Sequence, residues 1–376
     1  MMQAAFVLLA AVAEILWTKP ICVETNRYIG WPTVCVRKSG ELMAVFSGDR
    51  DAHVCPFGKV QLVRSVDGGE TWSSPQTIRN SSMDDRDAGL IELADGTLLV
   101  NFFSSSCYKN IGETGRKAIS ETYRRVYEKI PEADALRDTG YFSMRSADGG
   151  KTWGELARMR GSANHGGIQL RDGRVLVVGR RWNSQGNFHE KDPAEKGRVH
   201  ELPVEISADG GRTWKVLSRI CPQPPYSVTD MHEPHVIELT DGTLLVHLRC
   251  HGGHRRTVQC ESRDGGRTWG PVHETGICGY PSHLLQLKSG ALLSTYASRD
   301  EGRFGEYARL SSDAGKSWDA QGEICLAKHF NSDLGYPSTV ELEDGTLVTV
   351  YYQARRQGEK PCLMATKWRL NLENKE

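Results

Sequence analysis

The chain has 376 residues, of which 39% are hydrophobic, and its 47 basic and 47 acidic side chains cancel. This balance leaves no electrostatic footprint for nucleic acid or for an anionic membrane surface, so we expect neither as a partner. The ten cysteines include no Cys-x-x-Cys pair, which argues against a zinc or thioredoxin-like site. The length alone allows two domains, but one closed repeat domain can also fill it.

The chain begins with a short apolar run that ends in Ala11-Val12-Ala13. This run resembles a secretory signal, although no basic residue precedes it, and it is too short for a transmembrane span. We therefore separate residues 1–18, as a signal-like segment, from a single domain at 19–376. The segment favours a secreted or periplasmic protein, and the cytoplasm is the alternative.

Two short patterns alternate along the rest of the chain. The pattern Ser-x-Asp-x-Gly-x-x-Trp occurs at 65–72, 146–153, 207–214, 262–269 and 311–318. A glycine-centred turn between apolar residues, such as LADGTLLV, has its glycine at 40, 96, 173, 242, 290 and 345. Asp-Gly between alternating apolar residues is a strong hairpin signal, because these turns need positive φ. Two hairpins in each repeat give four strands, which make one propeller blade.

The turn glycines are 48 to 77 residues apart, whereas a four-stranded blade needs about 40–50 residues. The wider gaps therefore hold insertions, at about 104–140 and 184–200. In the first, the spacing of Tyr123, Tyr127 and Ile130 predicts a short helix that ends near Pro131. The second is a polar loop, and either insertion can rim a binding site or lie on the outer edge. We predict an all-β fold, a six-bladed β-propeller with a short helical insertion.

A further short motif precedes each hairpin glycine, where the innermost strands of a propeller converge on its axis. The six motifs are GWPTV at 30–34, DRDAGLI at 85–91, NHGGIQL at 164–170, HEPHVIEL at 232–239, YPSHLLQL at 280–287 and YPSTVEL at 336–342. The polar residues at their heads are placed around one point, which predicts a ligand pocket there. For any one of these residues, a core or turn role is the alternative.

The Ser-x-Asp-x-Gly-x-x-Trp repeats resemble the Asp boxes of sialidases, whose catalytic domain is a six-bladed propeller. The resemblance covers about residues 28–368, but Asp boxes also occur in propellers with other activities. HEPHVIELTDGTLLVHLRC, at 232–250, resembles the sialidase stretch with a glutamate at its start and a substrate-binding arginine at its end. It implies these roles for Glu233 and Arg249. RFGEYARLSSDAG and GYPSTVEL resemble the segments of another such arginine and of the nucleophile, which implies Arg303 and Tyr336.

The chemistry of these residues is coherent without the resemblance. A phenol such as Tyr336 ordinarily has a pKa near 10 and needs a nearby base, such as Glu233, to attack an anomeric carbon at neutral pH. A neutral nucleophile also avoids repulsion from a substrate carboxylate, unlike the paired carboxylates of other glycosidases. Arg249 and Arg303 suit that carboxylate, because a guanidinium donates two hydrogen bonds in fixed geometry. A salt bridge of Glu233 and packing of Tyr336 on its proline are the structural alternatives.

The sequence departs from the sialidase pattern in two places. The first arginine of the substrate-binding triad is absent, because Gly30-Trp31-Pro32 stands in its motif. SGDRDAHVCPFGKVQLVRS, at 47–65, resembles the segment with the acid aspartate, and Arg50 matches an arginine there, but no aspartate stands at the acid position. A carboxylic acid or an imidazolium can protonate a leaving-group oxygen. The nearest candidates for this general acid are Asp51 and His53, with Asp49 as a third.

Other residues of the inner strands are candidates for sugar binding, which combines hydrogen bonds with an aromatic platform. The hydrogen-bonding candidates are Asp85, Arg86, Asp87 and His165, and the aromatic candidates are Trp31, Tyr280 and Tyr296. Arg299 is a candidate replacement for the absent arginine. The histidines between 232 and 283 have no His-x-His or His-Glu-x-x-His spacing, so we expect no metal and no cofactor.

The sequence thus predicts a sialidase-like exo-glycosidase that hydrolyses a terminal, anionic sugar from a glycan or oligosaccharide. Tyr336 is the predicted nucleophile, and Glu233 assists it. Two alternatives stay open. The first is a polysaccharide lyase, in which Tyr336 or His165 removes a proton beside a uronate carboxylate, and the second is a glycan-binding propeller without catalysis.

Overall fold

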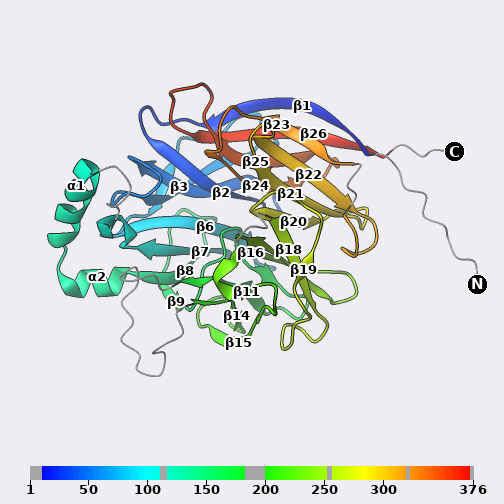
Figure 1. Ribbon diagram of the computed structural model, residues 1–376, viewed down its shortest axis with the longest axis horizontal. Helices are drawn as coiled ribbons and strands as arrows, with labels where there is room; N and C mark the ends of the chain where they lie inside the picture. Colours follow the sequence, from blue (N-terminus) through cyan, green and yellow to red (C-terminus); the bar gives the residue numbers. More distant parts are fainter. Residues whose placement is uncertain (1–10, 111–116, 183–199, 252–255, 319–321, 373–376) are drawn as a thin grey trace, which may run out of the picture.

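The computed structural model describes residues 11–110, 117–182, 200–251, 256–318 and 322–372. Its strands form six four-stranded antiparallel sheets, each a blade of a propeller (Figure 1). The prediction of a six-bladed β-propeller with a helical insertion is confirmed. In each blade, the innermost strand carries one of the short motifs.

Blades 1 to 3 follow one another along the first half of the chain. Blade 1 contains β2 (Tyr28–Val36), β3 (Leu42–Arg50), β4 (Lys59–Ser65) and β5 (Gln76–Arg79). Blade 2 contains β6 (Asp84–Glu92), β7 (Leu98–Ser105), β8 (Gly140–Ser146) and β9 (Ala157–Met159). Blade 3 contains β10 (Ile168–Gln169), β11 (Val175–Val178), β14 (Pro203–Ser207) and β15 (Lys215–Arg219). A ribbon of β12 (Arg181–Trp182) and β13 (His200–Glu201) connects β11 to β14.

Blades 4 to 6 complete the ring. Blade 4 contains β16 (Met231–Glu238), β17 (Leu244–Cys250), β18 (Arg256–Ser262) and β19 (His273–Glu274). Blade 5 contains β20 (Ser282–Gln286), β21 (Leu292–Ser298), β22 (Gly305–Ser311) and β23 (Ile324–Lys328). Blade 6 contains β24 (Leu334–Glu341), β25 (Leu347–Gln353), β26 (Cys362–Leu372) and β1 (Ala11–Cys22). Short 3-10 helices lie at Cys107–Asn110 and Val228–Asp230.

The two ends of the chain meet in blade 6. Strand β1 pairs antiparallel with β26 as the outermost strand of that blade, and Figure 1 shows the two side by side. The sheet therefore includes residues 11–18, which the sequence analysis placed in the signal-like segment and outside the domain at 19–376. Export of the protein stays a prediction.

The hydrophobic core is divided among the interfaces between blades. Middle strands such as β21 and β25 are buried along their whole length, because neighbouring blades cover both of their faces. At the interface of blades 1 and 2, Val45 and Leu62 pack with Phe102 and Phe142. Aromatic and β-branched residues suit strands packed in this way.

The Asp boxes form the turns between the third and fourth strands of blades 1 to 5. In the first box, the Ser65 hydroxyl donates to the Asp67 carboxylate at 2.8 Å and accepts the Gly69 N–H at 2.9 Å. Gly69 has a φ of 90°, which glycine adopts without steric cost. The same two bonds occur at Ser146, Asp148 and Gly150, at Ser207, Asp209 and Gly211, at Ser262, Asp264 and Gly266, and at Ser311, Asp313 and Gly315. The eight-residue pattern therefore determines its own turn.

Three of the box tryptophans also connect neighbouring blades. The indole N–H of Trp214, in blade 3, donates to the Ser143 hydroxyl of blade 2 at 2.8 Å. Trp269 and Trp318 make equivalent bonds to Ser218 and Gln259 of the preceding blades. Each of these boxes thus fixes a turn within one blade and a contact with the preceding blade.

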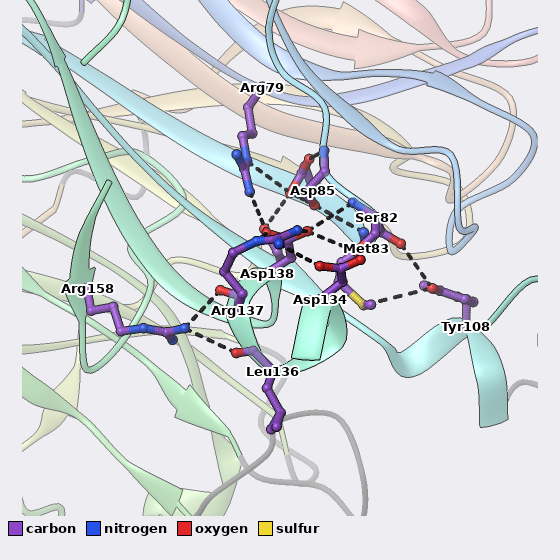
Figure 2. Close-up of polar contacts among 12 residues, drawn as sticks. Arg79, Ser82, Met83, Asp85, Tyr108, Asp134, Leu136, Arg137, Asp138 and Arg158 are labelled. Carbon is purple, nitrogen blue, oxygen red and sulfur yellow. Dashed lines mark hydrogen bonds and ion pairs between the residues drawn. The ribbon is translucent and has the colours of Figure 1, made fainter. Parts of the chain in front are cut away.

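The first insertion forms two helices beside blade 2, α1 (Lys117–Glu128) and α2 (Glu132–Asp138). The predicted helix before Pro131 is confirmed as α1, whereas the sequence analysis missed α2. Figure 2 shows how α2 is held: its Asp138 carboxylate accepts the Ser82 hydroxyl at 2.9 Å, and Arg158 donates to the Leu136 carbonyl at 3.1 Å. The second insertion, except His200, lies outside the described residues. Among the residues with a described structure, no helix has the length and apolar character needed to cross a membrane.

Helix α1 packs on the loop between β3 and β4. Its Tyr123 forms a small core with Cys55 of that loop and with Tyr108, and Val54 and Tyr127 border this core. The first insertion therefore supports the loop that carries His53.

We expect Ser65→Ala to lower the free energy of unfolding by about 1–3 kcal/mol, because it leaves the buried Gly69 N–H without a partner. Val66→Ala is the matched control, since the neighbouring Val66 is 83% exposed, and it should change the stability by less than about 0.5 kcal/mol. Urea unfolding of both variants measures the difference. Equal stabilities would contradict a stabilising role for the box.

Candidate functional site

The heads of four inner strands share an unusual backbone. Trp31, Asp87, Glu233 and Tyr336 have left-handed φ values of 56°, 54°, 47° and 56°. Each lies where its strand loses register with the neighbouring strand. Such bulges re-aim a side chain out of the regular alternation of a strand. Here they bring side chains from blades 1, 2, 4 and 6 to one end of the propeller axis.

A cavity of about 390 Å³ lies at this end of the axis, within the range of about 300–1,000 Å³ of small-molecule sites. Within the described chain, its titratable lining consists of His53, Arg86, Asp87, Cys107, Tyr141, Arg180, His232, Glu233, Arg249, His251, Arg299 and Tyr336. The rest of the lining is Val54, Phe103, Ser105, Ser162 and Asn164. The first insertion reaches this cavity through Cys107, just after β7. The site therefore combines residues from all parts of the chain.

The predicted nucleophile and base are in direct contact. The Tyr336 hydroxyl donates a hydrogen bond to Glu233, and Arg249 donates to both oxygens of that carboxylate at 2.8 Å. Burial raises the pKa of Glu233, but Arg249 and the hydrogen bonds outweigh burial and hold the pKa at about 2. Burial, followed by the charge of Glu233, raises the pKa of Tyr336 well above its usual value. The resting pair is thus a neutral phenol and a carboxylate.

The structure corrects the position of the second arginine beside this pair. Arg303 does not line the cavity and pairs with Glu323 at 2.6 Å. Arg299 lines the cavity instead, with its guanidinium 5.8 Å from the centre of the Tyr336 ring. Hydrogen bonds to the Leu334 carbonyl and the Tyr352 hydroxyl, at 2.8 and 3.2 Å, hold it there. The chain turns after β21, so Arg299 at the strand end faces the axis and Arg303 does not.

The candidate general acids separate in the same way. Asp51 pairs with Arg27 and does not line the cavity, and Asp49 pairs with Arg27 and Lys59. His53 does line the cavity. However, burial and the nearby guanidinium groups lower its pKa to about 3, which keeps the imidazole neutral at neutral pH.

Asp87 is the other acid of the cavity, although the sequence analysis had it as a sugar-binding residue. Its carboxylate accepts from the Asn164 amide at 3.0 Å and from Arg86 at 3.3 Å. Burial raises the pKa of Asp87, against the opposing effect of Arg86, and Glu233 raises it further. The two buried carboxylates of the cavity therefore differ: Glu233 is ionised, whereas Asp87 retains a proton more readily.

Several other candidates lie behind the cavity wall. The Trp31 ring supports Arg86, whose guanidinium is 4.4 Å above it, and the Tyr280 ring supports Arg249 at 4.3 Å. Neither ring lines the cavity, so the structure gives these two no contact with a sugar there, and their role as platforms stays a prediction. Tyr296, the third aromatic candidate, is fully buried and donates to Glu323.

Three predicted sugar-binding residues are also placed elsewhere. Arg50 is fully buried in a bidentate pair with Asp84, at 2.6 and 2.8 Å. Asp85 accepts the Ser81 backbone N–H at 2.6 Å on the side of the insertion. His165 lies deeper along the axis, with its ring 5.7 and 5.3 Å from those of His235 and His283. These residues support the inner strands and do not line the cavity.

The space left by the absent arginine is occupied by aromatic rings. A side chain at Gly30 would begin 3.3 Å from the Tyr28 ring and 3.6 Å from the Tyr352 ring. The first blade therefore contributes no guanidinium to the cavity through this motif. Across the described part of the chain, no group of three His, Cys, Asp or Glu side chains is placed to hold a metal ion.

The sequence analysis missed Arg180 altogether. Arg180 follows its hairpin glycine, Gly173, by seven residues, and Arg249 follows Gly242 by the same seven. Because the blades repeat, equal offsets place both arginines at the same end of their second strands. A comparison of offsets among blades would have identified Arg180 from the sequence.

Comparison with known proteins agrees with the architecture. Residues 126–349, more than half of the chain, match the family model described as BNR repeat-like domain. A sialidase of Bacteroides fragilis (strain YCH46) is 22% identical over 353 residues, which are 86% of this chain and 59% of that sialidase. The chain thus spans less than two thirds of that relative.

Solved structures show the same fold. A protein of unknown function from Dyadobacter fermentans DSM 18053 superposes with a TM-score of 0.75 at 22% identity, covering 96% of this chain and 99% of that one. The NanB sialidase of Streptococcus pneumoniae gives a TM-score of 0.65 at 15% identity, covering 96% and 70%. The fold is therefore that of the sialidase-type propellers. Within that class, the chain belongs to the BNR repeat-like family, as a divergent sialidase-like member.

We expect Arg299→Gln to weaken the binding of a sugar carboxylate such as N-acetylneuraminate by about tenfold or more, because it removes a charged donor beside Tyr336. Arg303→Gln is the control and should change the dissociation constant by less than about twofold, since it acts outside the cavity. Isothermal titration calorimetry compares the two variants. A larger effect at Arg303 would contradict the placement.

Proposed function

We propose that the protein is an exo-glycosidase of the sialidase type that hydrolyses a terminal, anionic sugar from glycans. The observation that carries this proposal is the hydrogen bond from the Tyr336 hydroxyl to the Glu233 carboxylate, which Arg249 holds from the other side. A buried phenol in contact with a fixed carboxylate, at the wall of a cavity of suitable size, is the arrangement that a tyrosine nucleophile needs.

The first step forms a bond between the Tyr336 oxygen and the anomeric carbon. The phenol proton passes to Glu233 as the phenol attacks, so no free phenolate has to form in a site where burial disfavours it. The glycosidic bond breaks at the same carbon, and its oxygen leaves with a proton from the general acid. The charges of Arg249 and Arg299 hold the substrate carboxylate throughout.

The second step returns the enzyme to its starting state. Water attacks the anomeric carbon and gives a proton to the conjugate base of the general acid. The bond to the tyrosine oxygen breaks, and Tyr336 recovers its proton from Glu233. The products are the free sugar and the shortened glycan.

We assign the general acid to Asp87. Its raised pKa and its place in the cavity fit this role, whereas the pKa of His53, about 3, leaves no proton to donate at neutral pH. In this assignment, His53 contributes hydrogen bonds to the sugar.

We expect Tyr336→Phe to lower kcat by more than about a hundredfold, because the nucleophile is lost, while the substrate still binds. Tyr307→Phe, outside the cavity, is the matched control and should retain activity. Release of free sugar from a panel of sialosides and uronosides measures the activity. An unsaturated product would instead indicate a lyase, and binding without turnover by the wild type would indicate a lectin-like protein.

A second test identifies the acid. Asp87→Asn should lower kcat/KM by about 10²–10⁴-fold on natural glycosides, but far less on nitrophenyl glycosides, whose leaving groups need no proton. His53→Asn should affect both substrates equally. Asp87 is the general acid if Asp87→Asn loses much more activity on natural glycosides than on nitrophenyl glycosides. If His53→Asn shows that difference instead, the assignment is overturned.

The pH profile gives an independent test. Activity on natural glycosides should fall as the pH rises through the raised pKa of Asp87, because the acid then loses its proton. Glu233, with a pKa of about 2, stays ionised across the working range and adds no acidic limb. Asp87→Asn should flatten the profile, and an unchanged alkaline limb in that variant would contradict the assignment.

A further inference from the structure

Arg180 is a buried cation at the cavity wall, and no described acidic residue pairs with it. The residue is 6% exposed and lines the cavity. It donates to the Arg181 carbonyl at 2.7 Å and lies 2.8 Å from the His200 Nδ1 atom, while its Nε atom has no partner. It forms no ion pair with a carboxylate in the part of the chain that the structure describes. Burial accordingly lowers the pKa of Arg180 to about 10.

Glu201, the described acid that Arg180 contacts, has its carboxylate already engaged. Arg180 contacts only the backbone carbonyl of Glu201, at 3.5 Å. The Glu201 carboxylate binds Arg160 at 2.5 Å, Arg219 at 2.6 Å and Arg181 at 3.5 Å. Three guanidinium groups therefore share this acid, and none of its charge is left to neutralise Arg180. A buried cation of this kind is usually paired or faces a ligand.

The balance of the described basic and acidic side chains in the cavity also leaves Arg180 without a counter-charge. Among the described residues, four arginines line the cavity, namely Arg86, Arg180, Arg249 and Arg299, with two acidic side chains, Asp87 and Glu233. Burial lowers the pKa of each lining histidine, so these side chains add no positive charge at neutral pH. Arg249 pairs with Glu233, and Arg86 pairs with Asp84 and Asp87, so Arg180 and Arg299 are left without an ion pair within the described residues. One substrate carboxylate neutralises only one of them.

The two unpaired arginines lie on different walls. Arg299 comes from blade 5 and lies beside Tyr336 of blade 6. Arg180 comes from blade 3, where its backbone pairs with that of Ser162 in an isolated β-bridge. Blades 3 and 6 are opposite in a six-bladed ring. A single carboxylate beside Tyr336 is therefore not positioned to meet Arg180 as well.

We propose that Arg180, together with Ser162, forms a second anion subsite, and that the natural substrate is a doubly anionic sugar. Its second group is a carboxylate, sulfate or phosphate, placed on the side of the sugar remote from the bond that is cleaved. This inference rests on the proposed function, since it assumes that the first carboxylate lies beside Tyr336.

The test compares three probes with the full-length chain. They are N-acetylneuraminate, its 9-phosphate, and its shortened analogue in which the glycerol side chain is replaced by a carboxylate. The wild type should bind at least one doubly anionic probe about tenfold or more tightly than the first, because a charged bidentate contact is added. The phosphate and carboxylate arms show which group the subsite takes.

Arg180→Gln should abolish this preference and leave the binding of N-acetylneuraminate within about twofold. Arg219→Gln is the matched control, because it removes an arginine from the same Glu201 cluster without touching the cavity. Equal binding of all three probes by the wild type, or a preference that survives Arg180→Gln, overturns the proposal.

The failure of the proposed function would look different. If Tyr336→Phe keeps full activity, the nucleophile is wrong, but an Arg180-dependent preference in the binding measurements still stands. If Tyr336→Phe is inactive and the preference is absent, the function stands without the second subsite.

Discussion

The site depends on a backbone constraint, the left-handed conformation at the heads of four inner strands. At Trp31, Asp87, Glu233 and Tyr336 this conformation costs about 1–3 kcal/mol per residue. The ring compensates through packing between blades and through closure by β1 and β26. Without these bulges, the strands would keep their regular alternation, and Tyr336 and Glu233 would not meet at the axis. The strain is thus located where the chemistry needs it.

The same rigid ring explains how a small cavity contains so many charges. Glu233 is fixed between Arg249 and Tyr336, so its charge is stabilised and its pKa stays at about 2 in spite of burial. Asp87 has a weaker cationic partner, because Arg86 approaches it only at 3.3 Å and also pairs with Asp84. The pKa of Glu233 is therefore lowered and the pKa of Asp87 is raised, although both side chains line one cavity. Such divergence suits a site with separate acid and base roles.

The sequence predicted what depends on local contacts and missed what depends on where strands end. The Asp boxes and the helix before Pro131 were predictable, because their hydrogen bonds and spacing lie within a few residues. Tyr336 and Glu233 followed from the resemblance of their motifs to sialidase segments. The same resemblance led to Arg303, because the pattern does not show that β21 ends just before Arg299. Asp51 failed as an acid because its pairing with Arg27 depends on how two loops meet. No local rule encodes that distance.

The absent arginine of blade 1 has a structural counterpart in blade 2. Trp31 stands in the motif where a guanidinium is expected, and Arg86 lies 4.4 Å above its ring and lines the cavity. A cation over an indole face is stabilised by the ring quadrupole, more strongly when both are buried. The replacement of the motif in blade 1 therefore builds a support for a cation from the next blade. The cavity therefore receives a guanidinium from blade 2 in place of the one absent from blade 1. This change in the position of the positive charge supports our proposal that the substrate carries a second anionic group.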